Sequence, residues 1–280
     1  MKTKCAPACM ACDYLGDTSE TCPGLPESSG PHWKPGDLNA YFEEVVDNTD
    51  GKGEYYRQFN PKALSRPLKD SKGNIVSGVK ETGPWIVLLE NFLSEKEADR
   101  IVQIGHTQGY ERSVRTVGVN QPDVTDGRTS DNTWCKEPSC MEDPLVSQVL
   151  ERIATTTKTT VKHSEHLQLL KYEPGQFYVQ HHDFIPYQLD LPCGARIMTL
   201  FLYLNDVVEG GNTSFPDLGI SVKPKKGSAL LWPNVKDEDP MEKDPRVEHE
   251  AEVVVKGVKY GANAWVHSED FQTPFQLKCF

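Results

Sequence analysis

The chain has 280 residues, which is enough for one large domain or for one domain with a small appendage. Its hydrophobic content of 37% is ordinary for a globular protein, no run of about 18 apolar residues predicts a transmembrane helix, and the start at Met1 lacks the apolar segment of a signal peptide. The formal net charge of −11 argues against a nucleic-acid-binding surface, which would need a stripe of basic residues.

Cysteine is frequent, with eight residues, and four of them lie close together at Cys5, Cys9, Cys12 and Cys22. These four fit either a small disulfide-bonded module or a four-thiolate zinc site. We favour disulfides, which form in an oxidising compartment, and therefore expect the endoplasmic reticulum or the secretory pathway, with the cytoplasm as the alternative. Residues 1–35 are accordingly predicted to form a Cys-rich N-terminal arm or small module.

Residues 36–83 contain scattered Gly, Pro and Lys with little periodicity, which predicts an irregular linker or covering segment with one short helix at 38–46. The main domain, residues 84–280, is expected to begin with a buried strand that ends at Leu89. A helix follows, because Ser94 and Glu97 have the spacing of a capping box and apolar residues then recur at helical spacing.

The polar segment 110–140 shows no clear periodicity, and a segment of this length is often a lid or a binding loop. Cys135 and Cys140 are placed to close a small ring within it. A second helix is predicted from Pro144 to Thr155, where apolar residues form one stripe.

Strands dominate from His166 onward, where short apolar segments are separated by turns that contain Gly, Pro or Asp. The predicted strands cover residues 166–172, 176–184, 196–205, 220–223, 228–232, 251–256 and 259–267. Many short strands with turn signals between them are typical of a sandwich or barrel. We therefore predict a mainly β fold with flanking helices, of the α+β class, built on a jelly-roll core.

The strand around His181 carries a candidate metal site. Because side chains alternate between the two faces of a strand, His181 and Asp183 are expected to share one face with Phe177 and Val179, and His182 to point to the other. An imidazole and a carboxylate two residues apart can then bind one metal ion. The pair alone is a weak signal.

A third ligand would have to come from a strand distant in the sequence, and His249 and His267 both lie at late strands. Two imidazoles and one carboxylate on one face of an octahedral Fe(II) leave three positions open for a chelating co-substrate and O2. The sequence thus indicates a non-haem iron site.

A series of short motifs in one order gives the chain a specific resemblance. The motifs are Tyr172-Glu-Pro-Gly-Gln176, His181-x-Asp183, Arg196-x-x-Thr199, Tyr203-Leu-Asn-Asp206, Glu209-Gly-Gly-x-Thr213-x-Phe-Pro216, Lys223-Pro-Lys-Lys-Gly227, Asp244-Pro-Arg-x-x-His249 and Lys256-Gly-x-Lys259. Over residues 84–280 the chain resembles the catalytic domain of prolyl 4-hydroxylases, which are Fe(II)/2-oxoglutarate-dependent dioxygenases with a double-stranded β-helix core. It is most similar to the short plant, algal and viral enzymes of this family.

The resemblance implies a set of iron ligands, which are His181, Asp183 and His249. It implies that Lys259 binds the distal carboxylate of the co-substrate 2-oxoglutarate, and a cation that holds one end of a dianion would orient the keto acid toward the metal. Further co-substrate contacts are expected from the hydroxyl groups of Tyr172, Thr199 and Thr213. Ascorbate is expected as a further cofactor of such an enzyme.

By the same resemblance, the residues expected at the peptide-proline site are Arg128, Arg196, Trp265 and His267. The implied activity is hydroxylation of peptidyl proline at C4 with O2 and 2-oxoglutarate, with release of succinate and CO2. The partner is then a proline-containing peptide or protein, which would bind in an extended polyproline II conformation.

Some positions depart from the family pattern. His182 stands where the family usually has an aromatic residue, Gln180 where proline is frequent, and Tyr260 where tryptophan is common. Because these departures leave the catalytic residues intact, they concern packing and substrate fit. Two alternatives stay open: another 2-oxoglutarate oxygenase of the same fold, acting on lysine or a small molecule, and a non-catalytic jelly-roll binding module that retains a metal.

Overall fold

The computed structural model describes residues 33–47, 53–68, 83–113, 115–116, 122–123 and 126–277. The four clustered cysteines near the N-terminus lie outside these ranges, so disulfides and a zinc site both stay predictions for them. Among the described residues, the helices are all too short or too polar to cross a membrane.

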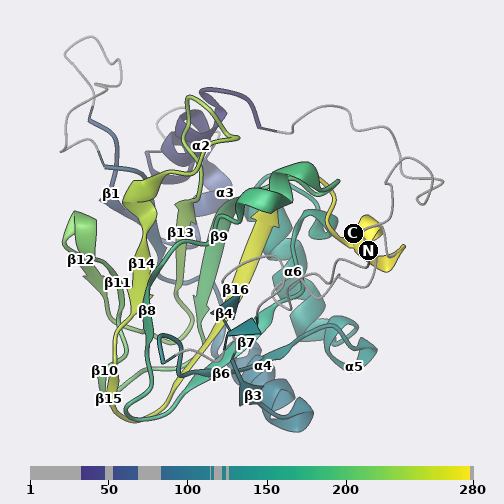
Figure 1. Ribbon diagram of the computed structural model, residues 1–280, viewed down its shortest axis with the longest axis vertical. Coiled ribbons are helices and arrows are strands. Elements are labelled where there is room, and N and C mark those ends of the chain that lie inside the picture. The colour runs from purple at the N-terminus through teal and green to yellow at the C-terminus, as the bar shows by residue number, and fades with distance from the viewer. Residues whose placement is uncertain are drawn as a thin grey trace.

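Two antiparallel sheets form the body of the protein (Figure 1). The larger sheet has eight strands, in the order β1-β2-β13-β9-β16-β7-β6-β3, and the smaller sheet has four, in the order β12-β11-β14-β8. The strands of the larger sheet are β1 Pro61–Ser65, β2 Ile86–Leu89, β3 Glu111–Arg112, β6 Asp131–Trp134, β7 Gln168–Tyr172, β9 Arg196–Tyr203, β13 Ala229–Pro233 and β16 Lys259–His267. Those of the smaller sheet are β8 Tyr178–His181, β11 Thr213–Phe215, β12 Ile220–Val222 and β14 His249–Ala251. Two further antiparallel pairs join β4 Arg115–Thr116 to β5 Pro122–Asp123, and β10 Glu209–Gly210 to β15 Val254–Lys256.

The two sheets face each other across an apolar core. This core includes Tyr172, Phe201, Tyr203, Phe215 and Trp232. Every residue of the central strand β9 is buried, because one of its faces meets the smaller sheet and the other packs beneath the helices. A continuous apolar sequence in β9, rather than a polar alternation, is the consequence of burial on both faces.

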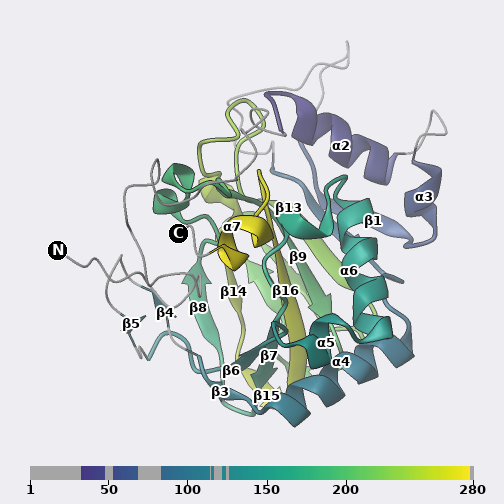
Figure 2. The same ribbon diagram turned by 90° about the vertical axis from the view of Figure 1, so that its right-hand side faces the viewer.

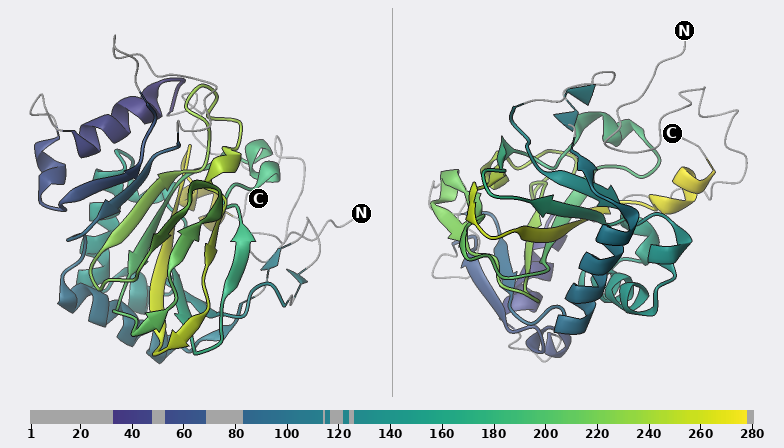
Figure 3. Two further views of the ribbon diagram at one scale, coloured as in Figure 1. Left: turned by 90° about the vertical axis from the view of Figure 1, so that its left-hand side faces the viewer. Right: turned by 90° about the horizontal axis from the view of Figure 1, so that it is seen from below.

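Helices α2, α3, α4 and α6 lie together on one side of the strands (Figure 2), and the left panel of Figure 3 shows the same layering from the opposite direction. The helices are α2 Asp37–Val46, α3 Glu54–Arg57, α4 Glu95–Gln108, α5 Pro138–Met141, α6 Pro144–Thr156 and α7 Gln272–Gln276. Short 3-10 turns span Val161–His163, Pro186–Asp190, Pro216–Leu218 and Pro245–Val247. The predicted capping box starts α4: the Glu97 amide donates to the Ser94 hydroxyl, and the Ser94 amide donates to the Glu97 carboxylate at 2.7 Å.

The segment 36–83 is more regular than the sequence predicts. Its described residues form α3 and the edge strand β1 in addition to α2, and β1 pairs with β2 of the larger sheet. Buried aromatic side chains hold this segment against the main core, with Phe42 stacked on Trp85 at 5.7 Å between ring centroids. The prediction of irregular structure is therefore wrong for residues 53–68, because irregularly spaced aromatic residues give no periodic signal.

The predicted lid at 110–140 is partly described, and its C-terminal part belongs to the larger sheet. There β6 pairs with β7. Just before β6 the chain runs along β8, where the Thr129 amide donates to the Phe177 carbonyl at 2.9 Å. Cys135 and Cys140 form a disulfide that closes the small ring after β6.

Candidate active site

Three side chains from two neighbouring strands of the smaller sheet converge on one point. His181 ends β8, Asp183 follows it, and His249 begins β14 directly opposite His181. Nε2 of His181 lies 3.8 Å from Oδ1 of Asp183, and Nε2 of His249 lies 3.7 Å from Oδ2 of Asp183. Ligand atoms of all three residues lie within 4.8 Å of one another, so they can bind one metal ion. His182 is not among them, in line with its predicted opposite direction.

A β-bulge in β8 changes which residues face this site. Tyr178 pairs with Ala251 and His181 pairs with His249, so that three steps along β8 match two along β14. As a result Tyr178 turns toward the site, and its ring stacks on that of His181 at 3.6 Å between centroids. The simple alternation that places odd-numbered residues on the metal face is therefore wrong for the residues before His181.

Hydrogen bonds on the far side of each imidazole orient the two histidines. Nδ1 of His181 donates to the Val179 carbonyl at 2.9 Å, and Nδ1 of His249 donates to the Val247 carbonyl at 3.0 Å. With the proton on Nδ1, each ring presents an unprotonated Nε2 to the site, which is the form that binds a metal. Burial, and then the neighbouring His249, lower the pKa of His181 well below its usual value, which also favours the neutral ring.

A chain of two hydrogen bonds orients the carboxylate of Asp183. Thr199 donates to Oδ2 at 2.8 Å, and Asn234 in turn donates to the Thr199 hydroxyl at 2.9 Å. Burial favours a raised pKa, but at the low pH where a carboxyl group titrates, the charges of protonated His249 and His181 hold the pKa of Asp183 well below its usual range, so the group is ionised at neutral pH. Thr199, predicted as a co-substrate contact, thus has its hydroxyl on a metal ligand.

Lys259, the first residue of β16, is fully buried, and its Nζ has no hydrogen-bond partner among the described residues. The ammonium lies 5.2 to 5.9 Å from the ring centroids of Tyr172, Phe201 and Tyr203. Burial lowers the pKa of Lys259 to about 7 against a smaller opposing effect of Glu252. A buried cation without a counter-charge is costly, so this arrangement indicates a place for an anionic ligand.

One pocket connects Lys259 with the metal site. The predicted residues that line it are Arg128, Tyr172, His181, Thr213, His249 and Lys259. The structure therefore brings together the residues predicted for the co-substrate, apart from Thr199. A small dianion in this pocket can reach the ammonium at one end and the metal site at the other.

Arg128, a residue expected at the peptide-proline site, lies beside the metal-binding residues. Its guanidinium lies 4.7 Å from the ring centroid of Tyr178, and the ring of Tyr178 also stacks on the imidazole of His181. The guanidinium also donates to Gln168 of β7 at 3.1 Å. Arg128 is thereby fixed at the pocket by two strands.

Three other predicted substrate residues form a separate buried cluster around Glu165. Arg196 donates to both carboxylate oxygens of Glu165, at 2.6 and 3.0 Å, and its guanidinium lies 3.8 Å from the ring centroid of Trp265. His267 donates from Nε2 to Glu165 at 2.9 Å and from Nδ1 to the Gly194 carbonyl at 2.8 Å. Because both ring nitrogens face acceptors, the imidazole carries both protons.

Sequence reasoning missed Glu165 and Tyr178. Glu165 is a single acidic residue before β7 with no periodic signal, and only the need of two buried cations for a counter-charge points to it. Strict alternation places Tyr178 on the opposite face, and a bulge is not visible in the sequence.

Comparisons with known proteins agree with this geometry. Residues 167–267 match the model of the 2OG-Fe(II) oxygenase superfamily. Prolyl 4-hydroxylase 2 of Arabidopsis thaliana is 32% identical over 210 residues, which cover 67% of this chain and 69% of that protein. The chain belongs to the prolyl 4-hydroxylase family of 2OG-Fe(II) oxygenases.

Other members of the family extend the comparison. The alpha-2 subunit of prolyl 4-hydroxylase from Gallus gallus is 33% identical over 211 residues, or 74% of this chain but only 37% of that subunit. The crystal structure of the viral collagen prolyl hydroxylase of Paramecium bursaria Chlorella virus-1, as its 2OG complex, shares 28% identity and a TM-score of 0.51, and covers 68% of this chain and 99% of the viral chain. The predicted family and the predicted fold, mainly β with a jelly-roll core, are both confirmed.

The residues present fit the iron and the 2-oxoglutarate that this family uses. Two neutral imidazoles and one ionised carboxylate are a suitable donor set for Fe(II). The unpartnered amine of Lys259 is a suitable partner for a carboxylate in the same pocket.

Proposed function

We propose that the protein is a prolyl 4-hydroxylase, which hydroxylates peptidyl proline at C4 with O2 and 2-oxoglutarate and releases succinate and CO2. The observation that carries the proposal is the pocket that joins two residues of the metal-binding triad, His181 and His249, to the buried ammonium of Lys259, which has no hydrogen-bond partner among the described residues. A hydrolytic metal site would have no use for that ammonium. The family relationship supports the same conclusion.

Iron and 2-oxoglutarate, when bound, supply the oxidative chemistry: one oxygen atom of O2 enters succinate as CO2 leaves, and the other becomes the hydroxyl group of the product. The protein supplies binding and orientation. Lys259 neutralises the distal carboxylate of the co-substrate, and the pocket presents Tyr172 and Thr213 beside it. His181, Asp183 and His249 hold the metal at the other end of the pocket.

The substrate contacts divide into two groups. Arg128 and Tyr178 line the pocket, and we assign them to the face that meets the peptide. Arg196 and His267 are buried and both donate to Glu165, and Arg196 also donates to the Asp183 carbonyl, so we assign them to the support of Trp265 and of the segment around Asp183. The peptide itself would dock in an extended polyproline II conformation, which loses little entropy on binding.

Two further features belong to this proposal. Ascorbate would serve as a reductant that keeps the metal as Fe(II). The protein would act in the endoplasmic reticulum or the secretory pathway, and the disulfide between Cys135 and Cys140 supports this location because such bonds persist in oxidising compartments.

The test is incubation of the protein with Fe(II), 2-oxoglutarate and peptides of three kinds: polyproline, Pro-Pro-Gly repeats and Ser-Pro repeats. We expect succinate, and by mass spectrometry the gain of one oxygen atom on proline, and neither in His181→Ala or His249→Ala. Succinate formed only with lysyl peptides or small molecules would indicate a different oxygenase. Near-normal turnover by either histidine variant would contradict the ligand assignment.

A further inference from the structure

His182 lies between two metal ligands, yet its imidazole makes two hydrogen bonds away from the metal. Nε2 lies 2.8 Å from the carbonyl oxygen of Asp244, and the Phe184 amide donates to Nδ1 at 2.9 Å. A carbonyl can only accept and an amide N–H can only donate, so the ring carries its proton on Nε2. Both ring nitrogens are thus used by a single neutral tautomer.

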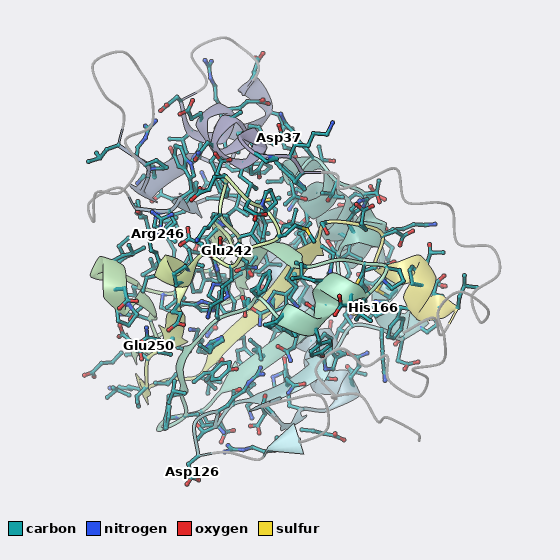
Figure 4. All side chains as sticks on the ribbon, turned by 45° about the horizontal axis from the view of Figure 1, so that its top comes forward. Asp37, Asp126, His166, Glu242, Arg246 and Glu250 are labelled. Atoms are coloured by element: carbon teal, nitrogen blue, oxygen red, sulfur yellow. A yellow bond between two sulfur atoms is a disulfide. The ribbon has the colours of Figure 1, made fainter. Side chains whose placement is uncertain are left out.

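Asp244 is itself held in place by several hydrogen bonds. Its carboxylate is buried and accepts from the Arg246 amide at 3.1 Å and from the Arg246 guanidinium at 2.8 and 2.6 Å. Its carbonyl, the partner of His182, also accepts from the Val247 amide at 3.3 Å and so begins the 3-10 turn Pro245–Val247. His249 follows that turn after one residue, between Arg246 and Glu250, which are labelled in Figure 4.

A second connection runs from the same loop back to the metal. The Asp244 amide donates to the Asn234 carbonyl at 3.0 Å, and the Asn234 side chain donates to Thr199. Thr199 donates to the carboxylate of Asp183. The residues on either side of one peptide bond, His182 and Asp183, are therefore tied to the loop before His249 by two separate routes.

We propose that His182 is a positioning residue, whose imidazole holds the turn that carries His249 against the segment that carries His181 and Asp183. The inference rests on the metal site of the proposed function. Without the bond to Asp244, the connections that place the third ligand are the strand pairing of β14, the contact of Gln180 with Glu248 at 3.3 Å and the Thr199 route.

Three substitutions separate the two hydrogen bonds. His182→Gln places an amide nitrogen as many bonds from Cβ as Nε2, and so keeps the bond to Asp244. His182→Asn places an amide oxygen as many bonds from Cβ as Nδ1, and so keeps only the bond from Phe184. His182→Phe keeps a ring and loses both bonds. His106→Gln is the matched control. His106 is an exposed histidine on α4, and its ring forms a hydrogen bond with the Tyr260 hydroxyl.

The readout is binding of Mn²⁺ alone, measured by calorimetry without 2-oxoglutarate. We expect His182→Phe and His182→Asn to bind Mn²⁺ roughly 10-fold or more weakly, as is typical when an orienting contact of a ligand is removed. His182→Gln is expected to keep most of the affinity, and His106→Gln all of it. Hydrogen exchange at the Asp244 and Val247 amides should accelerate in the Phe and Asn variants only. In turnover, the iron concentration required should rise more than kcat falls.

The proposal is overturned if His182→Phe binds Mn²⁺ as wild type does, or if the Gln and Asn variants are equally impaired. The second result would show that the ring only fills space. Failure of the wild-type protein to bind Mn²⁺ would instead remove the metal site of the proposed function, and this inference with it. The melting temperatures of the variants separate misfolding from loss of positioning. Gln and Asn are alike in polarity, so equal melting temperatures with different Mn²⁺ affinities would show that only the position of the metal ligand has changed.

Discussion

Two buried cations in the larger sheet have opposite surroundings. Lys259 begins β16 and Arg196 begins β9, and both side chains are shielded from solvent. The guanidinium of Arg196 donates to the two oxygens of Glu165, whereas the ammonium of Lys259 lies near aromatic rings and has no hydrogen-bond partner among the described residues. The charge of Arg196 is thus paired within the described part of the protein, and that of Lys259 is not.

The pKa shifts of the two sites show which buried charge is stabilised by the surrounding protein and which is not. Although burial favours a raised pKa, Arg196 and His267 hold the pKa of Glu165 below its usual value, so this cluster is an ion pair at neutral pH. Burial lowers the pKa of Lys259 to about 7, so its charged form is destabilised until an anion arrives. The Arg196 cluster balances its charges within the fold, whereas we propose that Lys259 serves in binding.

The largest effect is expected on protein stability when the ion pair between Arg196 and Glu165 is broken. Glu165→Gln should lower the free energy of unfolding by roughly 3–5 kcal/mol, because removal of one partner of a buried pair leaves the other charge uncompensated. Urea unfolding measures this change. As the control, Glu44→Gln breaks a surface pair with Lys158 at 2.6 Å and should cost less than about 1 kcal/mol. Equal losses in the two variants would show that the buried cluster is no more important than a surface pair.

The next effect concerns Lys259. Lys259→Met should weaken 2-oxoglutarate binding on the order of 100-fold, because the distal carboxylate would then be buried without a counter-charge. The same variant should melt at a higher temperature than wild type when no 2-oxoglutarate is present. The 2-oxoglutarate dependence of succinate formation and thermal unfolding measure the two changes. Lys226→Met, which removes a lysine paired with Asp99, is the control, and an unchanged co-substrate requirement in Lys259→Met would place the anchor elsewhere.

The smallest effect, when it is measured over one pH unit, is a pH dependence of co-substrate binding that should require Lys259. Its pKa is about 7 in the folded, ligand-free protein, so binding of the dianion needs uptake of a proton above that pH. The affinity for 2-oxoglutarate should then fall by up to about tenfold per pH unit above 7. Anaerobic calorimetry with Mn²⁺ between pH 7 and pH 9 checks the slope. A flat profile in wild type, or the same slope in Lys259→Met, would contradict the assignment.

The stability of the ligand-free protein should change with pH in the opposite direction to its affinity for 2-oxoglutarate. The unfolded chain holds the Lys259 proton up to the ordinary lysine pKa of 10.5, whereas the folded chain loses it near 7. Between these values the unfolded state binds more protons, so this group makes the ligand-free protein more stable as the pH rises. That contribution should be missing in Lys259→Met.

Much of the fold follows from local patterns. The strand predicted at 259–267 coincides with β16, and the helix predicted after Ser94 coincides with α4, because each has its own turn or cap in the sequence. The segment predicted at 251–256 divides instead between β14 and β15, which pair with different strands. Strand limits depend on which partner is available, and the partner is not encoded locally.

The candidate site divides in the same way. The candidate metal ligands and Lys259 stand in motifs that resemble those of the family, and the resemblance names them as candidates. The roles of Arg196 and His267 depend on Glu165, a residue outside any motif. A motif gives the chemistry of a side chain, whereas its role depends on what it touches.

The sequence by itself determined the class of fold, through its short apolar segments and turn signals, and its family motifs named candidates for the metal ligands and for the cation at the co-substrate. Tertiary structure alone decided that Tyr178 faces the metal, that Arg196 is neutralised by Glu165, and that His182 holds the loop before His249. The physical reason is that hydrogen bonds and ion pairs are short-ranged in space but join residues far apart in the chain. Which of them form is fixed only when the sheets close.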